Sequence, residues 1–141
     1  MDDAPGLQRF VDAQDAGGTY AAAVAELRSG RKRSHWMWFV FPQVAGLGRS
    51  STARHYALSG LAEARAYLDH PVLGPRLRES AAVLTGLDER DPVLVLGPVD
   101  AVKLRSSMTL FARAAPDERV FTDVLAHFFD GVPNDATLRL L

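Results

Sequence analysis

Cysteine is absent from this chain of 141 residues. Its absence excludes disulfide scaffolds, thiolate metal sites and cysteine nucleophiles, and it suits a reducing compartment. Long apolar runs are missing as well, because none approaches the roughly twenty residues that a membrane-spanning helix requires. The first residues, MDDAPGLQRF, are acidic and lack the apolar core of a secretory signal. We therefore expect a soluble, cytoplasmic protein that does not bind a membrane.

An excess of either charge is also lacking, since 16 lysines and arginines are balanced by 17 aspartates and glutamates. Dedicated nucleic-acid binders usually carry a strong basic excess, so this class of partner is disfavoured. The composition, 48% hydrophobic and 23% charged, is that of an ordinary globular protein, and the length suits one domain. We expect residues 1–141 to form a single domain.

Strand patterns are scarce, whereas apolar residues recur at helical spacing along most of the chain. The stretches expected to be helical are 7–14, 19 to the stop at Ser29 and Gly30, 61–69, 75–84, 99–114, 120–129 and a short helix from Asn134 or Asp135 to Leu141. Residues 36–41 and 93–96 fit either a short strand or a helical turn. The predicted fold class is all-α, a compact single-domain bundle of helices with at most one minor short β pair.

The stretch 99–114, VDAVKLRSSMTLFARA, carries polar groups beside its apolar stripe. At about 100° per residue, its side chains fall into a core stripe, a flanking polar row and an outward side. The core stripe consists of Ala101, Leu104, Met108 and Phe111. The flanking polar row consists of Asp100, Lys103 and Ser107, and the outward side consists of Arg105, Thr109 and Arg113. Because a buried unpaired charge costs several kcal/mol, the flanking charges must pair with each other or contact a ligand. Both alternatives remain open from the sequence.

A glycine-containing turn, AGLGRSS at residues 45–51, precedes another predicted helical segment that runs to about Leu58. Ser50 or Ser51 can cap this segment, and Arg49 and Arg54 flank it. Such a turn can hold an anion, although the sequence has no Gly-Lys-Ser/Thr and is therefore not a P-loop. A plain capped turn is the alternative.

Both tryptophans of the chain lie in RKRSHWMWFVFPQ, residues 31–43. We expect Phe39 and Phe41 to anchor the core, and the basic run 31–33 to be a solvated turn. His35, Trp36 and Trp38 each carry a polar edge that needs a partner, and indoles form flat walls for planar rings. Gln43 has an amide that can recognise a base or another amide.

Other chemistry is sparse. The histidines at 35, 55, 70 and 127 lack metal-ligand spacing, so neither a metal nor a cofactor is predicted. Asp123 and His127 are expected to form a surface pair. Glu63, Tyr67 and His70 are expected on a solvated helix face.

Four blocks of the sequence resemble a known family: GRKRSHWMWFVFPQ at 30–43, GLGRSS at 46–51, YLDHPVLGPRLRE at 67–79 and DAVKLRSSMTLFARAAP at 100–116. This is the bacterial family catalogued as domain of unknown function 1810. The resemblance runs from LQRFVDAQ at residue 7 to the C-terminal ATLRLL and is weakest at 86–97. The resemblance implies a mostly helical single-domain fold, but it does not point to an activity. The pattern is also similar to helical N-glycosidases that act on ADP-ribose-like or riboflavin-precursor substrates.

Three functions follow as hypotheses, and the sequence does not decide whether the protein is an enzyme. The first is a small-molecule enzyme or ligand binder for a nucleotide-like or phosphorylated ligand. Its catalytic candidates are His35, Asp100 and Lys103, and its binding candidates are Trp36, Trp38, Gln43, Arg49, Ser50, Ser51, Arg54, Ser106 and Ser107. The alternative is a non-catalytic ligand-sensing or protein-interaction module, and the third is a binder of single-stranded nucleic acid. The oligomeric state is not predicted.

Overall fold

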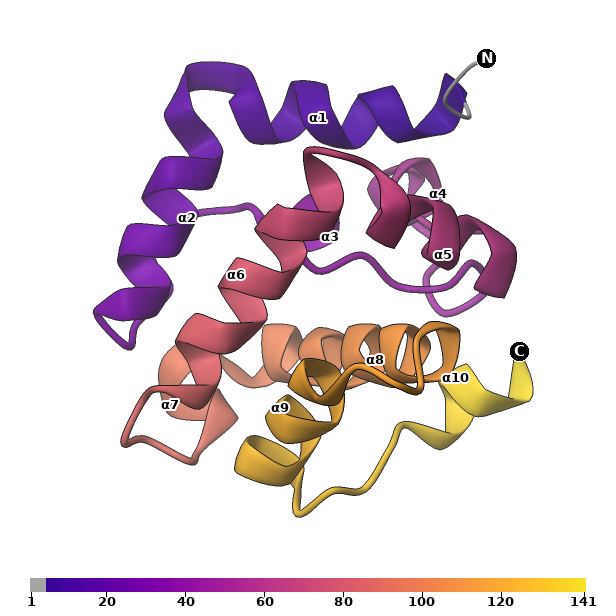
Figure 1. Ribbon diagram of the computed structural model, residues 1–141. Coiled ribbons are helices and arrows are strands. Elements are labelled where there is room, and N and C mark those ends of the chain that lie inside the picture. The colour runs from indigo at the N-terminus through magenta and orange to yellow at the C-terminus, as the bar shows by residue number, and fades with distance from the viewer. Residues whose placement is uncertain (1–4) are drawn as a thin grey trace.

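Nearly all regular structure in the computed structural model, which describes residues 5–141, is helical (Figure 1). In chain order the helices are η1 (Pro5–Leu7), α1 (Gln8–Asp15), η2 (Ala16–Gly18), α2 (Thr19–Arg28), α3 (Met37–Val40), α4 (Ser51–His55), α5 (Leu61–Asp69), α6 (Leu73–Thr85), α7 (Pro92–Leu96), α8 (Pro98–Ala114), α9 (Arg119–Phe129) and α10 (Asp135–Arg139). The predicted all-α class is confirmed.

Local chemistry sets several of the helix boundaries. Gly17 and Gly18 have φ of 59° and 72°, a left-handed conformation that turns the chain between α1 and α2. Asp91 begins α7, because its carboxylate accepts a hydrogen bond of 2.9 Å from the N–H of Val93 and Pro92 occupies the first turn. The ambiguous stretch 93–96 is therefore helical, and so is most of 36–41, which contains α3.

The expected minor β pair is reduced, in the described residues, to one isolated parallel bridge between Val44 and Leu58. The N–H of Leu58 donates to the carbonyl of Gln43 at 2.9 Å, and the N–H of Ala45 donates to the carbonyl of Leu58 at 2.7 Å. These two bonds close the loop that contains α4, so that both ends of the loop have fixed positions.

The core is built around a continuous row of aromatic rings. Phe10 of α1, Tyr67 of α5, Phe111 of α8 and Phe121 of α9 are all fully buried. Successive ring centroids are 5.3, 5.5 and 5.7 Å apart, a spacing at which aromatic pairs attract. In Figure 1, α1 lies along one side of the molecule and α8, α9 and α10 lie along the opposite side, with α5 and α6 between them. The row therefore joins the two sides.

Three side chains that were expected to face solvent are buried instead. The hydroxyl of Tyr67 receives a hydrogen bond of 3.2 Å from the amide of Gln14, and burial raises the pKa of this phenol. Nδ1 of His70 accepts from the backbone N–H groups of Val72 and Leu73, at the start of α6. Thr109 lies beneath the chain segment that leads into α10. Helical periodicity predicts the direction in which a side chain leaves the helix. It does not predict whether another segment of the chain packs over that side chain.

No helix in the part of the chain that the structure describes has both the length and the apolar character needed to cross a bilayer.

Candidate functional site

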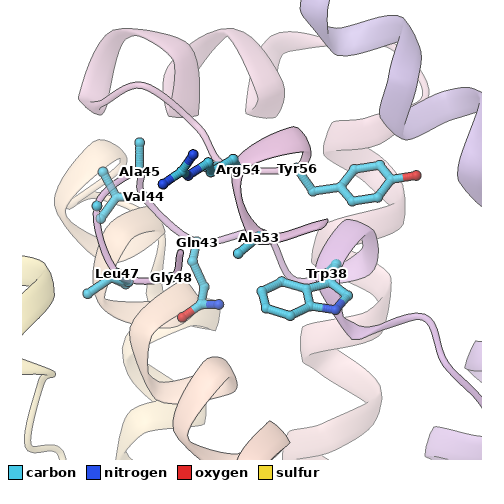
Figure 2. A pocket seen from close by; sticks show the side chains of 11 residues that line it. Trp38, Gln43, Val44, Ala45, Leu47, Gly48, Ala53, Arg54 and Tyr56 are labelled. Atoms are coloured by element: carbon cyan, nitrogen blue, oxygen red, sulfur yellow. The ribbon is translucent and has the colours of Figure 1, made fainter. Parts of the chain in front are cut away.

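Two neighbouring hollows share one wall beside Trp38. The inner hollow has a volume of about 110 Å³ and is lined by Trp38, Gln43, loop 44–48, Ala53, Arg54, Tyr56 and Ala57 (Figure 2). The outer hollow has a volume of about 430 Å³ and is lined by Trp38, Gln43, Leu47, Gly48, Pro98, Val99, Val102 and Lys103. Because four residues line both hollows, we treat the two as one cleft between the loop 43–57 and the first turns of α8.

The loop wall of the cleft depends on glycine at two positions. Gly46 has φ of 105°, a conformation that L-residues rarely adopt. At Gly48 a Cβ atom would lie 2.6 Å from the Cβ of Ala53, so only glycine allows the loop to approach α4 this closely. The AGLG sequence is therefore needed to build the inner hollow, whatever the hollow binds.

Lys103 connects the cleft to a group of charges at the start of α8. Its ammonium lies 3.7 Å from the centroid of the Trp38 ring, a close cation–π contact, and 3.3 Å from Oδ1 of Asp100. The other carboxylate oxygen of Asp100 lies 2.8 Å from Nζ of Lys32. All three charged side chains are largely buried, with exposed fractions of 9% for Lys32 and 17% for the other two. The prediction that the basic run 31–33 is solvated is therefore wrong for Lys32, because Asp100 of α8 pairs with it. The i, i+3 pair exists, and Lys103 also lines the outer hollow.

Two polar groups of the cleft have no partner within the described residues. The side-chain amide of Gln43 makes no hydrogen bond there, although the bridge to Leu58 fixes its backbone. The guanidinium of Arg54 is exposed and makes no ion pair there. Figure 2 shows Arg54 above Ala53 and the indole of Trp38 below it. The cleft thus offers an aromatic wall, a free amide and two cations.

The comparisons with known proteins come from a family model and a solved structure. The model described as "Protein of unknown function (DUF1810)" matches residues 4–141. The chain belongs to this family. The DUF1810 chain is also similar to the conserved hypothetical protein Rv1873 from Mycobacterium tuberculosis, whose crystal structure aligns with a TM-score of 0.92 and 49% sequence identity, covering 96% of this chain and 95% of that one. Among curated proteins, none matches.

Some predicted residues of the DUF1810 chain lie outside the cleft. His35 is exposed and lines neither hollow. Trp36 is fully buried, and its Nε1 donates to Glu26 at 3.0 Å, so it cannot serve as a wall for a ligand. Arg49 and Ser51 are exposed beside the inner hollow but are not part of its lining.

The remaining predicted serines have structural positions. The hydroxyl of Ser50 accepts from the N–H of Ala53 at 3.1 Å and caps α4. The hydroxyl of Ser106 donates to the carbonyl of Val102 at 3.1 Å. Ser107 is fully buried, and its hydroxyl has no partner within the described residues. Asp123 and His127 do not form the expected surface pair. Nε2 of His127 lies 2.9 Å from the carbonyl oxygen of Glu89 instead.

Sequence analysis of the DUF1810 chain missed the apolar wall of the outer hollow. Val99 and Val102 are 66% and 58% exposed, and Pro98 precedes them. The available signal is the occurrence of valines on the outward side of the stretch 99–114, where polar residues are expected. Across residues 5–141, no three side chains of the metal-binding types come together in a group that could hold a metal ion.

Proposed function

We propose that the cleft binds a small anionic molecule that carries a flat ring, of the nucleotide-like or phosphorylated class. The observation that supports this most directly is the convergence of Trp38, the unpartnered amide of Gln43 and the cations Lys103 and Arg54 on one cleft. An indole beside exposed valines suits a planar ring, and the amide suits a ring edge with donors and acceptors.

Charge favours an anion over a neutral ligand. The residues that line the two hollows include Lys103 and Arg54 but, in the described part of the chain, no carboxylate. The nearby carboxylate of Asp100 has Lys32 as a second partner, so it does not neutralise Lys103 fully. An anion placed in the cleft therefore meets an excess of positive charge, and at the largely buried Lys103 the electrostatic attraction is stronger than in water.

Binding without chemistry is favoured over catalysis. A general acid or base must reach the reacting atoms, and His35 does not line the cleft. Both oxygens of Asp100 contact lysines. The second candidate, hydrolysis of an N-glycosidic bond, rests on the position of Lys103 between Asp100 and the outer hollow. Water would replace the base at the anomeric carbon, Asp100 accepting a proton from the water and Lys103 giving one to the leaving base.

The test is titration of the purified chain with nucleoside monophosphates, measured by calorimetry, for the parent and for Trp38→Leu. We expect the parent to bind and Trp38→Leu to bind about tenfold or more weakly, because stacking of a base on an aromatic side chain contributes about 1–3 kcal/mol. Phe129→Leu is the matched control, since Phe129 is a partly buried aromatic residue of α9 outside the cleft.

Unchanged affinity in Trp38→Leu, or no binding of any nucleotide by the parent, contradicts the proposal. Mass spectrometry of the recovered ligand separates the two candidates. A ligand returned intact supports binding alone. A ligand returned as free base and sugar phosphate supports the hydrolase, and this cleavage must then disappear in the Asp100→Asn, Lys103→Ala double variant.

A further inference from the structure

We infer that the inner hollow is a subsite for a single phosphate group, and that the cleft therefore selects nucleoside monophosphates over diphosphates and triphosphates. This inference rests on the proposed function, because it concerns the same cleft, and it adds the orientation and the phosphorylation state of the ligand.

Volume assigns the two halves of the ligand to the two hollows. The inner hollow, at about 110 Å³, is smaller than an engineered cavity of about 150 Å³ that holds one benzene ring, so its size suits a single tetrahedral group better than a nucleobase. The outer hollow, at about 430 Å³, has room for the ring and the sugar.

The chemistry of the two linings agrees with this assignment. The outer hollow is lined by Trp38 and by apolar residues of α8, including the exposed Val99 and Val102. The inner hollow has Arg54, whose guanidinium carries donors in a planar fork that matches phosphate oxygens and has no competing ion pair in residues 5–141. Leu47 and Gly48 line the same hollow, and their backbone N–H groups make no hydrogen bond within residues 5–141.

The wall of the inner hollow limits it to one phosphate. The bridge between Val44 and Leu58 closes the loop at one end, and the packing of Gly48 against Ala53 closes it near α4. The backbone hydrogen bonds of 2.7 and 2.9 Å at this bridge hold the two ends of the loop together, so we expect the inner hollow to keep its size when a ligand binds. A diphosphate would therefore have to leave its second phosphate outside the hollow or displace the ring from Trp38.

The experiment compares affinities for a nucleoside and its mono-, di- and triphosphate in the parent chain and two arginine variants. We expect the monophosphate to bind at least tenfold more tightly than the other three. Arg54→Ala should lose this preference, with monophosphate affinity falling at least tenfold and nucleoside affinity unchanged. Arg49→Ala is the matched control, since Arg49 is an exposed arginine five positions earlier that does not line the hollow, and it should behave as the parent.

Equal affinities across the series, or equal effects of the two arginine variants, overturn the monophosphate subsite while leaving nucleotide binding intact. Failure of all four ligands to bind the parent overturns the subsite together with the proposed function. Thermal unfolding of both variants verifies that the chain stays folded. Both arginines are exposed, so neither substitution removes a buried contact.

Discussion

Glu26 organises the segment that carries both tryptophans. Its carboxylate accepts hydrogen bonds from the N–H groups of Arg33 and Ser34 at 2.7 and 3.0 Å, from the hydroxyl of Ser34 at 2.6 Å and from Nε1 of Trp36 at 3.0 Å. Burial by itself raises the pKa of Glu26, but the hydrogen bonds from Ser34, Arg33 and Trp36 together outweigh it and lower the pKa to about 2. The carboxylate form is thus the one that the fold stabilises.

We predict that Glu26→Gln lowers the free energy of unfolding by about 1–2 kcal/mol at pH 7, because hydrogen bonds to a charged group are lost. The pKa is depressed on folding, so this stability is complete above the unfolded value of 4.5 and is lost as the pH falls toward 2. Urea unfolding at pH 7 and pH 3 should show a smaller difference between parent and variant at pH 3. The exposed Asp117, changed to Asn, serves as the control, and a difference that does not depend on pH contradicts the assignment.

Single residues show where sequence reasoning succeeds and fails. Lys103 was predicted to lie beside the core stripe because 100° per residue fixes its direction, and the structure places it in the cleft. Thr109 was predicted to face outward on the same grounds, yet it is buried, because residues 132–134 fold back over it. Trp36 and Trp38 were treated alike in the sequence. Their environments differ in the structure, because Glu26, ten residues before Trp36, accepts a hydrogen bond from the buried indole, whereas Lys103 contacts the ring of Trp38.

The short helix α4 forms one wall of the inner hollow and depends on its first residue. The sequence left Ser50 and Ser51 as equal candidates for the cap, and the structure assigns the cap to Ser50. We predict that Ser50→Ala lowers the free energy of unfolding by about 1 kcal/mol, the typical cost of losing an N-cap side chain.

Ser51→Ala provides the matched comparison, because Ser51 is exposed and its hydroxyl makes no hydrogen bond in the described residues. Its effect should stay within about 0.5 kcal/mol, as for most surface substitutions. Urea unfolding measures both variants, and hydrogen exchange of residues 51–55 locates the change. Equal destabilisation by the two substitutions would show that the cap has been assigned to the wrong serine.

Element type was predictable where the apolar pattern is long and failed where it is short. Helices α5, α8 and α9 are close to their predicted bounds, since each extends over several turns with a clear stripe. Residues 93–96 and 36–41 could not be assigned, because a run of four to six apolar residues fits a strand and a helix equally well. The feature that decides for a helix at 93–96 is the sequence Asp91-Pro92, an N-cap followed by proline.

The packing of α5 against α6 depends on a glycine without special backbone angles. A Cβ atom at Gly74 would overlap the carbonyl oxygen of Leu68, at the end of α5, and would lie 2.9 Å from a guanidinium nitrogen of Arg78. Alanine is favoured over glycine in a helix by about 1 kcal/mol, but forcing atoms into a packed region costs about 1–3 kcal/mol. The steric cost is the larger because backbone, and not a flexible side chain, must move.

We therefore predict that Gly74→Ala lowers the free energy of unfolding by about 1–2 kcal/mol, measured by urea denaturation. Gly86, at the other end of α6, is the matched control, because an added Cβ would meet its nearest atom, the carbonyl oxygen of Val83, at an ordinary 3.4 Å. Gly86→Ala should be neutral or stabilising by up to about 1 kcal/mol. If both substitutions have the same effect, the crossing of α5 and α6 is looser than the structure indicates.

The carboxylate shared by Lys32 and Lys103 has a consequence for how the cleft can fill. A ring that stacks on the outer face of Trp38 must push the Lys103 ammonium aside. In an ordinary ion pair this movement would leave the buried carboxylate unpaired, at a cost of several kcal/mol. Here Asp100 has a second counterion, because Nζ of Lys32 lies 2.8 Å from its Oδ2. Under the proposed function, the displaced ammonium would contact the bound anion, and Asp100 would keep a compensating positive charge beside it.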